Sequence, residues 1–415
     1  MIFNKLSIDN VNITGKRILM RVHFSVPLKD GKIVNDQRIV ASLDTIKYAL
    51  EKNAKSIVLL THIGRPQGRK IEKFSLKPLT EHLGKLLNRD IIFLNDCVGG
   101  EVEVACADPE PGSVFLLENV RFHLEEEGQG LDEHGNKIKA DPAAVKQFRQ
   151  SLRKLGDIYV NDAFGNAHRA HSSMIAEGFE LKVAGLLMKK ELEYFAKVLD
   201  KPQQPFVAIL GGAKIVDKIP LIENLLDKVT EMIICGGMAL TFLKEVKNMQ
   251  IGASLYDKEV ATTIQKLMCK ASERNVTIHF PVDFIAADRF DENARTNIVS
   301  VHEGIAEDWM GLDIGPQTCT LFDRPIKRAK LILWNGPAGV FEFDKFSNGS
   351  RALFDSLIEA TSNGCLTIVG GGDTATCAAK FNAEHKLSYV STGGGATLQL
   401  LQGKPLPGVA ALCNA

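Results

Sequence analysis

Short apolar runs alternate along the chain with amphipathic stretches, and this alternation restricts the fold more than any other feature of the sequence. The apolar runs are predicted to be strands, over residues 16–24, 55–63, 90–96, 113–122 and 157–164 in the first half and 205–212, 231–237, 276–284, 330–337 and 366–373 in the second. Between them lie stretches with helical periodicity, such as 37–54 and 217–229. Strands that alternate with helices form parallel sheets covered on both faces, which predicts an α/β fold.

The number of domains follows from the length. At 415 residues the chain exceeds what one hydrophobic core usually organises. We expect two Rossmann-like domains in tandem, each a doubly wound parallel sheet, joined by a helix and a hinge. Residues 188–205 have the pattern of one helix followed by a proline-containing exit, and a connector of this kind suits hinge motion.

The charge balance and the cysteines exclude several classes of protein. Lys+Arg and Asp+Glu both total 50, and hydrophobic residues make up 45%, which is typical of ordinary globular proteins rather than polybasic nucleic-acid binders. No apolar run approaches the roughly 18 residues that a membrane span needs. The eight cysteines lack paired spacing, and Cys97, Cys106 and Cys235 are interpreted as small buried hydrophobes in a reducing compartment. We expect a cytoplasmic protein without nucleic-acid or membrane partners.

Basic and polar side chains gather where the strands of the first half end. In open parallel sheets, ligands bind beyond the carboxyl ends of the strands. Arginine binds phosphate and carboxylate in bidentate fashion, so its recurrence at successive strand ends predicts a pocket for a small, multiply charged anion. Any one such residue alone would more often lie on a solvated surface. The set comprises His23, Ser25, Arg38, His62, Arg65, Arg121, Asn166, His168, Arg169 and His171.

The strands of the second half end instead in glycine. Glycine lets backbone amides approach a ligand closely, and a helix that begins just afterwards directs its amides at anionic oxygens. The glycines are Gly211, Gly212, Gly236, Gly237, Gly336, Gly339, Gly370, Gly371, Gly372, Gly393, Gly394 and Gly395. Lys214 and Lys218 follow the first pair, and Asp373 could bind Mg²⁺ directly or through water. Since neither a P-loop nor a GxGxxG fingerprint is present, the sequence predicts a phosphate site of another design.

Taken in order, the motifs resemble those of the phosphoglycerate kinase family over essentially the whole chain. They read RVHFSVP, THIGRP, LLENVRFHLEEEG, NDAFGNAHRAHSS, MKKELEYF, ILGGAKIVDKI, WNGPAGVFE, GGGDTA and STGGGA. The resemblance implies a glycerate-binding domain over 1–187, a helix and connector over 188–204, a nucleotide-binding domain over 205–400, and a segment 401–415 that returns to the first domain. It also implies that the two domains flank a cleft and bind 3-phosphoglycerate or its 1,3-bisphosphate and MgADP or MgATP.

The resemblance implies roles only at positions that match the family's motifs. The implied substrate-binding residues are His23, Ser25, Arg38, His62, Arg65, Arg121 and Arg169. The implied nucleotide-binding residues are Gly212, Ala213, Lys218, Gly236, Gly237, Gly311, Leu312, Asn335, Pro337, Gly339, Val340, Glu342, Gly372, Asp373 and Thr374. Catalytic roles are implied for Arg38, Lys214, Gly371 and Gly394, and a Mg²⁺ ligand for Asp373.

Two substitutions depart from the family pattern at the glycerate. The pattern RVDFNVP has an aspartate and an asparagine where this chain has His23 and Ser25. We expect His23 to be neutral, because the neighbouring arginines disfavour a second positive charge. Losing both hydrogen bonds would cost about 2 to 4.5 kcal/mol if nothing compensates. Further departures are Asn166 for threonine and, in the nucleotide half, Val216, Cys235, Leu240, Gln399 and Gln402.

These departures leave two functional hypotheses. The first is a glycolytic and gluconeogenic enzyme that transfers a phosphoryl group reversibly between 1,3-bisphosphoglycerate and ADP. The arginines, lysines and glycine loops that this reaction needs are all present in the sequence. The second is a catalytically weakened, nucleotide-binding paralogue with a regulatory or structural role. Under either hypothesis we expect a monomer.

Overall fold

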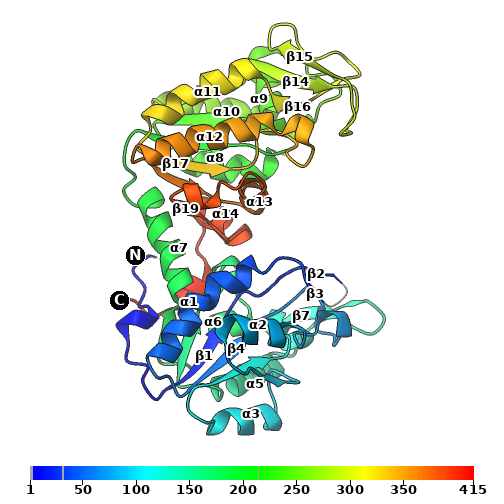
Figure 1. Ribbon diagram of the computed structural model, residues 1–415. Coiled ribbons are helices and arrows are strands. Elements are labelled where there is room, and N and C mark those ends of the chain that lie inside the picture. The colour runs from blue at the N-terminus through cyan, green and yellow to red at the C-terminus, as the bar shows by residue number, and fades with distance from the viewer. Residues whose placement is uncertain (1–2, 30–31, 214) are drawn as a thin grey trace. The chain divides into compact units, whose positions relative to one another are not determined.

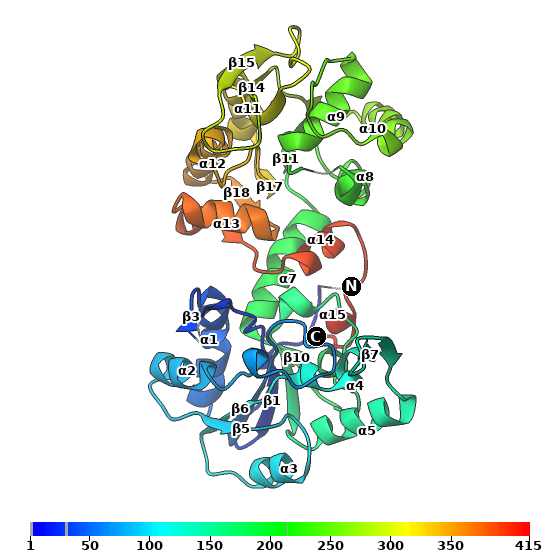
Figure 2. The same ribbon diagram turned by 90° about the vertical axis from the view of Figure 1, so that its right-hand side faces the viewer.

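The computed structural model describes residues 3–29, 32–213 and 215–415. The chain divides into two compact units, which are described separately below. Unit 1 consists of Met1–Glu193 and Pro405–Ala415, and unit 2 of Tyr194–Lys404. Figures 1 and 2 show both units as ribbons. No helix built from the described residues is both long enough and apolar enough to span a bilayer.

Unit 1 is built on a six-stranded parallel sheet with the order β10-β9-β1-β4-β6-β5. Its strands are β1 Arg17–Arg21, β4 Ser56–Leu60, β5 Ile92–Leu94, β6 Ser113–Leu117, β9 Ile158–Asn161 and β10 Lys182–Ala184. Strands β1 and β4 lie in the middle of the sheet, and all of their residues but Arg17 are buried. Because helices cover both faces, these strands are apolar almost throughout rather than alternating.

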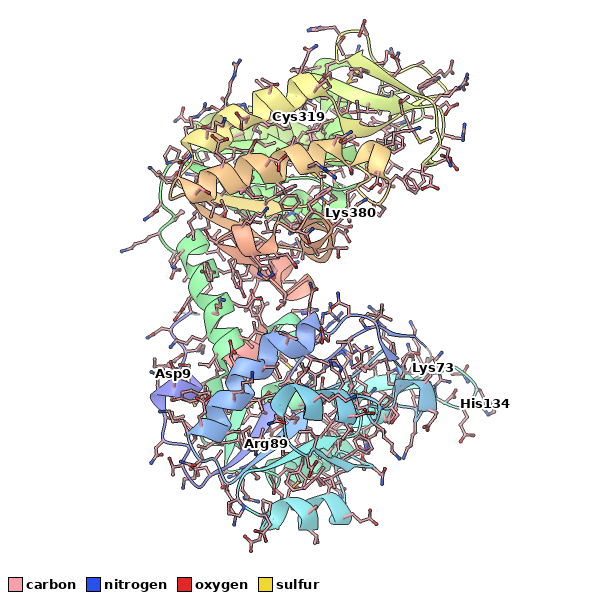
Figure 3. All side chains as sticks on the ribbon, viewed as in Figure 1. Asp9, Lys73, Arg89, His134, Cys319 and Lys380 are labelled. Carbon is pink, nitrogen blue, oxygen red and sulfur yellow. The ribbon has the colours of Figure 1, made fainter. Side chains whose placement is uncertain are left out.

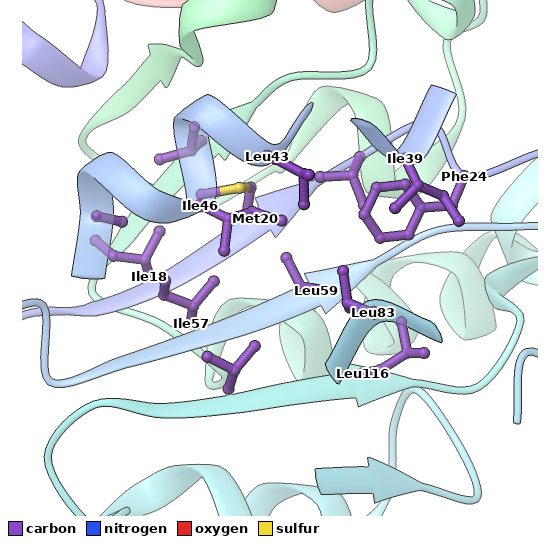
Figure 4. Close-up of a cluster of buried hydrophobic side chains, with 14 of the residues drawn as sticks. Ile18, Met20, Phe24, Ile39, Leu43, Ile46, Ile57, Leu59, Leu83 and Leu116 are labelled. Carbon is purple, nitrogen blue, oxygen red and sulfur yellow. The ribbon is translucent and has the colours of Figure 1, made fainter. Parts of the chain in front are cut away.

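The core of unit 1 lies between the sheet and helix α1 (Gln37–Glu51) (Figure 4). Ile39, Leu43 and Ile46 recur at helical spacing on α1 and pack into one cluster with side chains of β1 and β4. Figure 2 shows α1 and α2 on one side of this sheet and α5 on the other. The remaining helices of the unit are α2 Leu79–Leu87, α3 Gly100–Ala107, α4 Leu124–Glu127, α5 Pro142–Arg153, α6 Ser172–Ile175 and α15 Pro407–Ala410.

Smaller elements complete unit 1. Two hairpins pair β2 Leu28–Lys29 with β3 Lys32–Ile33, and β7 Gln129–Leu131 with β8 Lys137–Lys139. The 3₁₀ turns are η1 Ile8–Asn10, η2 Glu72–Phe74, η3 Val120–Phe122 and η4 Phe164–Asn166. Sequence periodicity predicted none of these, because two- and three-residue strands carry too little pattern.

The final residues of unit 1 pack against its N-terminal residues and one of its loops. The Leu6 amide donates to the Cys413 carbonyl, and the Cys413 amide to the Lys182 carbonyl, both at 2.9 Å. The Gly408 amide donates to the Ala167 carbonyl at 2.8 Å. Residues 405–415 therefore brace the loop that follows β9.

Helix α7 (Leu186–Leu199) contains the division between the units, at Glu193 and Tyr194. Its first turn is held by the buried carboxylate of Asp162, whose Oδ1 accepts from the amides of Leu187 at 3.0 Å and Met188 at 3.2 Å. These amides lack partners within the helix, so a carboxylate here acts as a cap.

Unit 2 contains a second six-stranded parallel sheet with the order β13-β12-β11-β17-β18-β19. The strands are β11 Phe206–Leu210, β12 Glu231–Ile234, β13 Thr277–His279, β17 Leu331–Asn335, β18 Leu366–Val369 and β19 Tyr389–Val390. The buried Trp334 on β17 packs against Phe354 on α12 within the main core. The predicted α/β fold with two doubly wound parallel sheets is thus confirmed.

The single strand predicted over 276–284 is wrong. The segment forms two strands in different sheets, β13 and then β14 (Asp283–Ala287). Strand β14 is the centre of a three-stranded antiparallel sheet between β15 (Thr296–Ser300) and β16 (Met310–Ile314). Pro281 lies at the break, where a residue without an amide hydrogen cannot continue a ladder.

Helices surround the sheets of unit 2. They are α8 Ile219–Leu225, α9 Gly236–Lys247, α10 Ala261–Glu273, α11 Pro316–Arg328, α12 Asn348–Ser362, α13 Gly372–Lys380 and α14 Gly395–Leu401. The 3₁₀ turns are η5 Val216–Lys218, η6 Lys258–Val260, η7 Asp344–Phe346 and η8 Glu384–Lys386. Three helices, α9, α13 and α14, begin at glycines that directly follow strands or strand-end loops, so their N-terminal amides are directed toward the same sheet edge.

Candidate active site

The carboxyl ends of the central strands of unit 1 share one edge, and the predicted basic residues lie on the loops that leave it. Residues 22–25 follow β1, 61–65 follow β4, 118–121 follow β6 and 162–171 follow β9. The parallel register of β1 with β4 and β9 places these loops next to one another. The predicted strands were too long here, since β1 ends at Arg21 and β6 at Leu117.

His62 is fixed by an arginine that sequence reasoning missed. Its Nδ1 lies 3.0 Å from Nη2 of Arg21, the last residue of β1. A guanidinium can only donate, so Nδ1 is the acceptor and the ring proton is on Nε2. Burial, and then the charge of Arg21, hold the pKa of His62 well below its ordinary value. His62 is therefore a neutral donor with a defined orientation.

Arg21 in turn is held by a buried polar network. It is fully buried, and its Nε donates to Ser173 Oγ at 2.8 Å. The Ser173 hydroxyl donates to Glu126 at 2.6 Å, and the Ser173 amide donates to the other oxygen of that carboxylate at 2.8 Å. Burial raises the pKa of Glu126, and the nearby Arg21 opposes that rise. An arginine inside an apolar strand and a glutamate beside the ENVRFH motif were the available sequence signals.

His23 faces the same cluster. Its ring stacks on that of His62, with centroids 6.0 Å apart and 12° between the planes. Burial, followed by the charges of Arg38, Arg21 and Arg121, holds the pKa of His23 well below its ordinary value. The expected neutral ring thus has burial as its first cause, and Arg21 is among the cations responsible.

The side chain of Arg38 contacts the backbone of Ser25. Nη1 of Arg38, in the first turn of α1, donates to the Ser25 carbonyl at 2.5 Å. The loop after β1 is also tied to β4, because the Phe24 amide donates to Thr61 Oγ1 at 3.0 Å. The arginine side chain itself is exposed, so it can reach a ligand.

Arg121 is the central buried cation among the predicted substrate residues. It is 8% exposed, and its Nη1 donates to the Gly64 carbonyl at 3.1 Å. Its Nε lies 3.3 Å from Glu127 Oε1. Burial lowers the pKa of Arg121, the carboxylates of Glu127 and Glu126 oppose that shift, and the positive charges of Arg169 and Arg65 add to it. The structure therefore brings these three arginines into one electrostatic group.

His168 and His171 complete the basic cluster. Burial, and then the charge of Arg169, lower the pKa of His168, while burial and the charge of Arg121 lower the pKa of His171 to about 3. The Nδ1 atoms of both rings are buried without a hydrogen-bond partner, as is the side-chain Oδ1 of Asn166. A cluster with this many cations and so few carboxylates is one that a bound anion stabilises.

In unit 2 the glycine loops pack backbone against backbone. A Cβ on Gly336 would lie 2.1 Å from the Gly211 carbonyl oxygen, and one on Gly236 would lie 2.6 Å from the Gly212 amide nitrogen. Gly336, Gly236 and Gly212 also have positive φ, at +100°, +66° and +102°. At Gly336 and Gly236, only glycine combines this conformation with this close approach. Gly237 begins the same α9 turn, and Ala213 follows Gly212 in the adjoining loop.

Asn335 and Thr374 tie these loops together. Asn335 Oδ1 accepts from Lys218 Nζ, and its Nδ2 donates to the Gly370 carbonyl at 2.7 Å. Thr374 Oγ1 accepts from the Gly336 amide at 2.7 Å. Burial lowers the pKa of Lys218 to about 8, and the Asp373 carboxylate opposes that shift. The carbonyl oxygen of Pro337, which is also buried, accepts a hydrogen bond from the Gly212 amide at 3.0 Å.

The start of α13 presents an exposed carboxylate. Gly371 caps the helix with φ +102°, followed by Gly372 and by Asp373 in the first turn. The Asp373 side chain is exposed, and within the described part of the chain no hydrogen bond or ion pair occupies it. Gly394, with φ +50°, caps α14 in the same way. Lys214, the other implied catalytic cation, lies outside the described residues.

The remaining candidate nucleotide-binding residues lie on β16 and in the loop after β17. Gly311 and Leu312 lie on β16, and the Val340 amide donates to the Leu312 carbonyl at 2.9 Å. A Cβ on Gly339 would lie 2.2 Å from Asp313 Oδ1, so this glycine permits close packing. Glu342 is exposed. The loop is anchored by Lys380, labelled in Figure 3, whose Nζ donates to the Phe341 carbonyl at 2.8 Å and to Asp344 at 2.6 Å.

Sequence reasoning missed an exposed aromatic residue near this loop. Phe290 is 61% exposed and lies against Phe343, with ring centroids 5.4 Å apart. Phe343 packs against the small cluster that contains Leu312 and Phe346. An apolar ring that remains exposed beside a candidate nucleotide site offers a face for stacking. No motif in the sequence had singled it out.

One further group in the described chain has the side chains of a metal site, in unit 1. The ligand atoms of Asp96, Cys97 and His123 lie within 4.8 Å of one another. His123 Nε2 and Asp96 Oδ1 are already paired at 2.6 Å. Burial raises the pKa of the Cys97 thiol well above its ordinary value, so it stays protonated and is a poor ligand. We assign this group a structural role.

Comparison with known proteins gives one consistent result. The family model described as "Phosphoglycerate kinase" matches residues 8–404. The chain is 62% identical over 415 residues to a phosphoglycerate kinase of Drosophila melanogaster, covering 100% of both proteins. It is 58% identical over 412 residues to phosphoglycerate kinase 1 of Homo sapiens, covering 99% of each.

Solved structures agree. The phosphoglycerate kinase of Coxiella burnetii matches with a TM-score of 0.84 at 38% identity, and that of Pyrococcus horikoshii with 0.80 at 27% identity. Each match covers 98% of both chains. The basic cluster, the glycine loops, the full-length identity and the shared fold all lead to the same conclusion: this chain belongs to the phosphoglycerate kinase family.

Proposed function

We propose that the chain catalyses reversible phosphoryl transfer between 1,3-bisphosphoglycerate and ADP, giving 3-phosphoglycerate and ATP. The single observation that carries this proposal is the pairing of two anion sites of different design on two units. Unit 1 supplies guanidinium groups oriented by buried partners, and unit 2 supplies glycine loops and helix N-termini. Nothing in the described structure or in the comparisons favours the catalytically weakened paralogue.

The glycerate end binds to unit 1. Arg65, Arg121 and Arg169 neutralise the phosphate and carboxylate, and the Nε2–H of His62 donates to one of their oxygens. Arg38 is exposed, as are Arg65 and Arg169, and it is proposed to lie nearest the transferred group, in keeping with its implied catalytic role. His23 and Ser25 line the same pocket.

The nucleotide binds to unit 2. Its phosphates contact the amides of Gly236, Gly237 and Gly372 at the starts of α9 and α13, beside Gly212, whose own amide is held by the Pro337 carbonyl. Burial lowers the pKa of Lys218, so its ammonium group loses a proton more readily than that of an exposed lysine. The negative charge of a bound phosphate raises this pKa again and keeps Lys218 positively charged. Thr374 and Asn335 hold the loops in place. The adenine ring packs on the Phe290 and Leu312 side of the site, and Glu342 binds the ribose.

The transfer itself needs alignment and neutralisation of charge rather than a covalent enzyme intermediate. Arg38, Lys214 and the amides at the Gly371 and Gly394 helix caps are proposed to stabilise the charge on the moving phosphoryl group. Such groups contribute most when they are held in place before the reaction. In unit 1, the Arg21–Ser173–Glu126 network and the Ser25 carbonyl provide that rigidity.

Asp373 fits a Mg²⁺ ion that accompanies the nucleotide. Mg²⁺ prefers oxygen ligands and is commonly held by one or two carboxylates together with phosphates and waters. Asp373 offers a single exposed carboxylate without a described partner, beside the helix terminus proposed to bind phosphate. The ion would supply charge neutralisation to the nucleotide phosphates.

The function is tested by turnover of 3-phosphoglycerate with MgATP in a coupled assay. We expect activity that falls sharply in Arg38→Ala, and MgADP binding that weakens in Asp373→Ala with the fold intact. Asp355→Ala, at an exposed carboxylate on α12, is the matched control for loss of a charge in the same unit. Absence of turnover in the parent protein with intact nucleotide binding would instead support the paralogue hypothesis.

Cellular location and assembly are proposed more broadly. All eight cysteines are free, which fits the reducing cytoplasm. Burial of Cys97, Cys106 and Cys235 confirms their interpretation as hydrophobic residues. The monomeric state and the absence of nucleic-acid and membrane partners stay predictions, tested by sedimentation and by binding assays.

A further inference from the structure

His23 brings to the basic cluster a partly exposed imidazole whose nitrogens make no hydrogen bond to a described residue. Its stacking on His62 fixes the ring plane without using either nitrogen. A neutral imidazole in this position therefore has one free lone pair that can accept a proton.

The neighbouring imidazoles are less able to accept one. The Nδ1 of His62 already accepts from Arg21, and protonation would break that bond. Burial, and then the charge of Arg121, hold the pKa of His171 at about 3, although Glu126 and Glu127 lie 3.8 Å and 3.6 Å from its nitrogens. The Nδ1 of His168 is buried without a partner, where a charge would be costly.

In the ligand-free protein the surroundings of His23 oppose protonation. The groups that face it are Arg21 at the end of β1, Arg38 on α1, His62 after β4, Arg121 on η3 and His168 after β9. Each of these is a cation or an imidazole, and the pKa is lowered accordingly. The charge of the cluster, together with burial, therefore decides the state of this ring.

A bound phosphoglycerate reverses this field, since its phosphate and carboxylate bring several negative charges among the same arginines. Charge–charge interactions at these distances are strong in a partly buried site. We propose that His23 takes up a proton when phosphoglycerate binds, so that substrate affinity in this chain rises as the pH falls. The proposal rests on the glycerate site assigned above.

The consequence is specific to a histidine at this position. An aspartate, which the family pattern places here, is ionised throughout the neutral range and takes up no proton. By linkage, the affinity of the histidine site changes by up to about tenfold per pH unit between the pKa values of the free and bound states. The sign follows from the raised pKa in the complex: affinity is highest below the free-state pKa and is lost as the pH rises through the bound-state pKa.

The test is calorimetric titration of the full chain with 3-phosphoglycerate from pH 6 to pH 8, in two buffers of different ionisation enthalpy. His23→Gln keeps a polar side chain of similar reach but cannot titrate. We expect the parent protein to take up more protons than His23→Gln, approaching about one proton near neutral pH. The ratio of the two dissociation constants cancels the titration of the ligand's own phosphate, and it should favour the parent increasingly toward pH 6.

His134→Gln is the matched control, because His134 is an exposed histidine of the same unit on the β7–β8 hairpin (Figure 3). It should leave proton uptake unchanged. If the parent and His23→Gln bind with equal proton uptake and a pH-independent ratio, the inference is overturned while the glycerate site stands. If neither binds 3-phosphoglycerate, both the site and the inference fail.

A second measurement covers the case in which His23→Gln alone fails to bind. The imidazole resonance of His23 in the labelled parent protein is assigned by its absence from the spectrum of that variant. Its pKa should rise by at least one unit when 3-phosphoglycerate is added. An unchanged titration curve in the saturated complex would contradict the proposal.

Discussion

In the loops of unit 2, replacing single glycines by alanine separates two contributions to the loss of stability, backbone strain and steric clash. Gly336 and Gly212 have nearly the same φ, +100° and +102°, which an alanine adopts only with strain. A Cβ on Gly336 would also lie 2.1 Å from the Gly211 carbonyl oxygen, whereas one on Gly212 would meet no atom within 4 Å. The two positions therefore share the strain, and only Gly336 adds a backbone clash.

The expected magnitudes follow. Strain of this kind costs about 1 to 3 kcal/mol, and relieving an overpacked contact costs roughly another 1 to 3 kcal/mol. Gly336→Ala should thus destabilise unit 2 by about 2 to 6 kcal/mol, and Gly212→Ala by about 1 to 3 kcal/mol. Gly372, without positive φ and with no atom within 4 Å of a Cβ, is the control. Gly372→Ala, at the start of α13, should be neutral or stabilise by about 0.5 to 1 kcal/mol.

Urea unfolding followed by tryptophan fluorescence measures this directly, because both tryptophans, Trp309 and Trp334, belong to unit 2. Calorimetric titration of the Gly336→Ala variant with MgADP then reports whether the displaced loop still binds phosphate. Equal losses of stability in Gly336→Ala and Gly212→Ala would show that the Gly211–Gly336 contact relaxes freely, and the argument for close backbone packing would be refuted.

Three further predictions concern charged and polar groups. Lys218→Met should weaken nucleotide binding about 10- to 150-fold, the worth of a charge-assisted hydrogen bond, while 3-phosphoglycerate affinity stays within error in calorimetry. The double variant His23→Asp with Ser25→Asn should bind 3-phosphoglycerate about tenfold more tightly at pH 8 and gain less at pH 6, and no gain at either pH would show that neighbouring groups already compensate. Burial raises the pKa of Asp162 to about 7, so the unfolded chain ionises first and stability is lost as the pH rises from about 4 to 7. Asp162→Asn removes this dependence. The stability of this variant relative to the parent should increase by about 2 kcal/mol between about pH 5 and pH 7, as measured by urea unfolding followed by circular dichroism. A difference that stays constant with pH would contradict the raised pKa.

The fold was predictable wherever the sequence carries a long periodic pattern. Residues 331–335 form an almost wholly apolar run, and α1 presents Ile39, Leu43 and Ile46 at helical spacing, so both were identified from local pattern. The split of 276–284 into β13 and β14 was not, because it depends on which sheet each half can join. That choice is made by tertiary pairing, and Pro281 was the only local signal.

The candidate site shows the same division. Strand-end glycines and arginines stand out in the sequence because parallel sheets bind ligands at that edge. Arg21 and Glu126 do not stand out, because their role comes from burial and from each other's charge across the unit. Arg21 in particular occupies the last position of β1, directly after the apolar residues 18–20, where the sequence pattern alone indicates a core residue.

The brace formed by residues 405–415 has a consequence for how the protein is made. These residues contact Leu6, Lys182 and the Ala167 carbonyl, which immediately precedes His168 and Arg169. Unit 2 is thus inserted into unit 1 along the chain, and a ribosome that has completed residue 193 has not yet supplied the last part of unit 1. The loop that carries His168 and Arg169 gains its final support only after the whole of unit 2 has been translated.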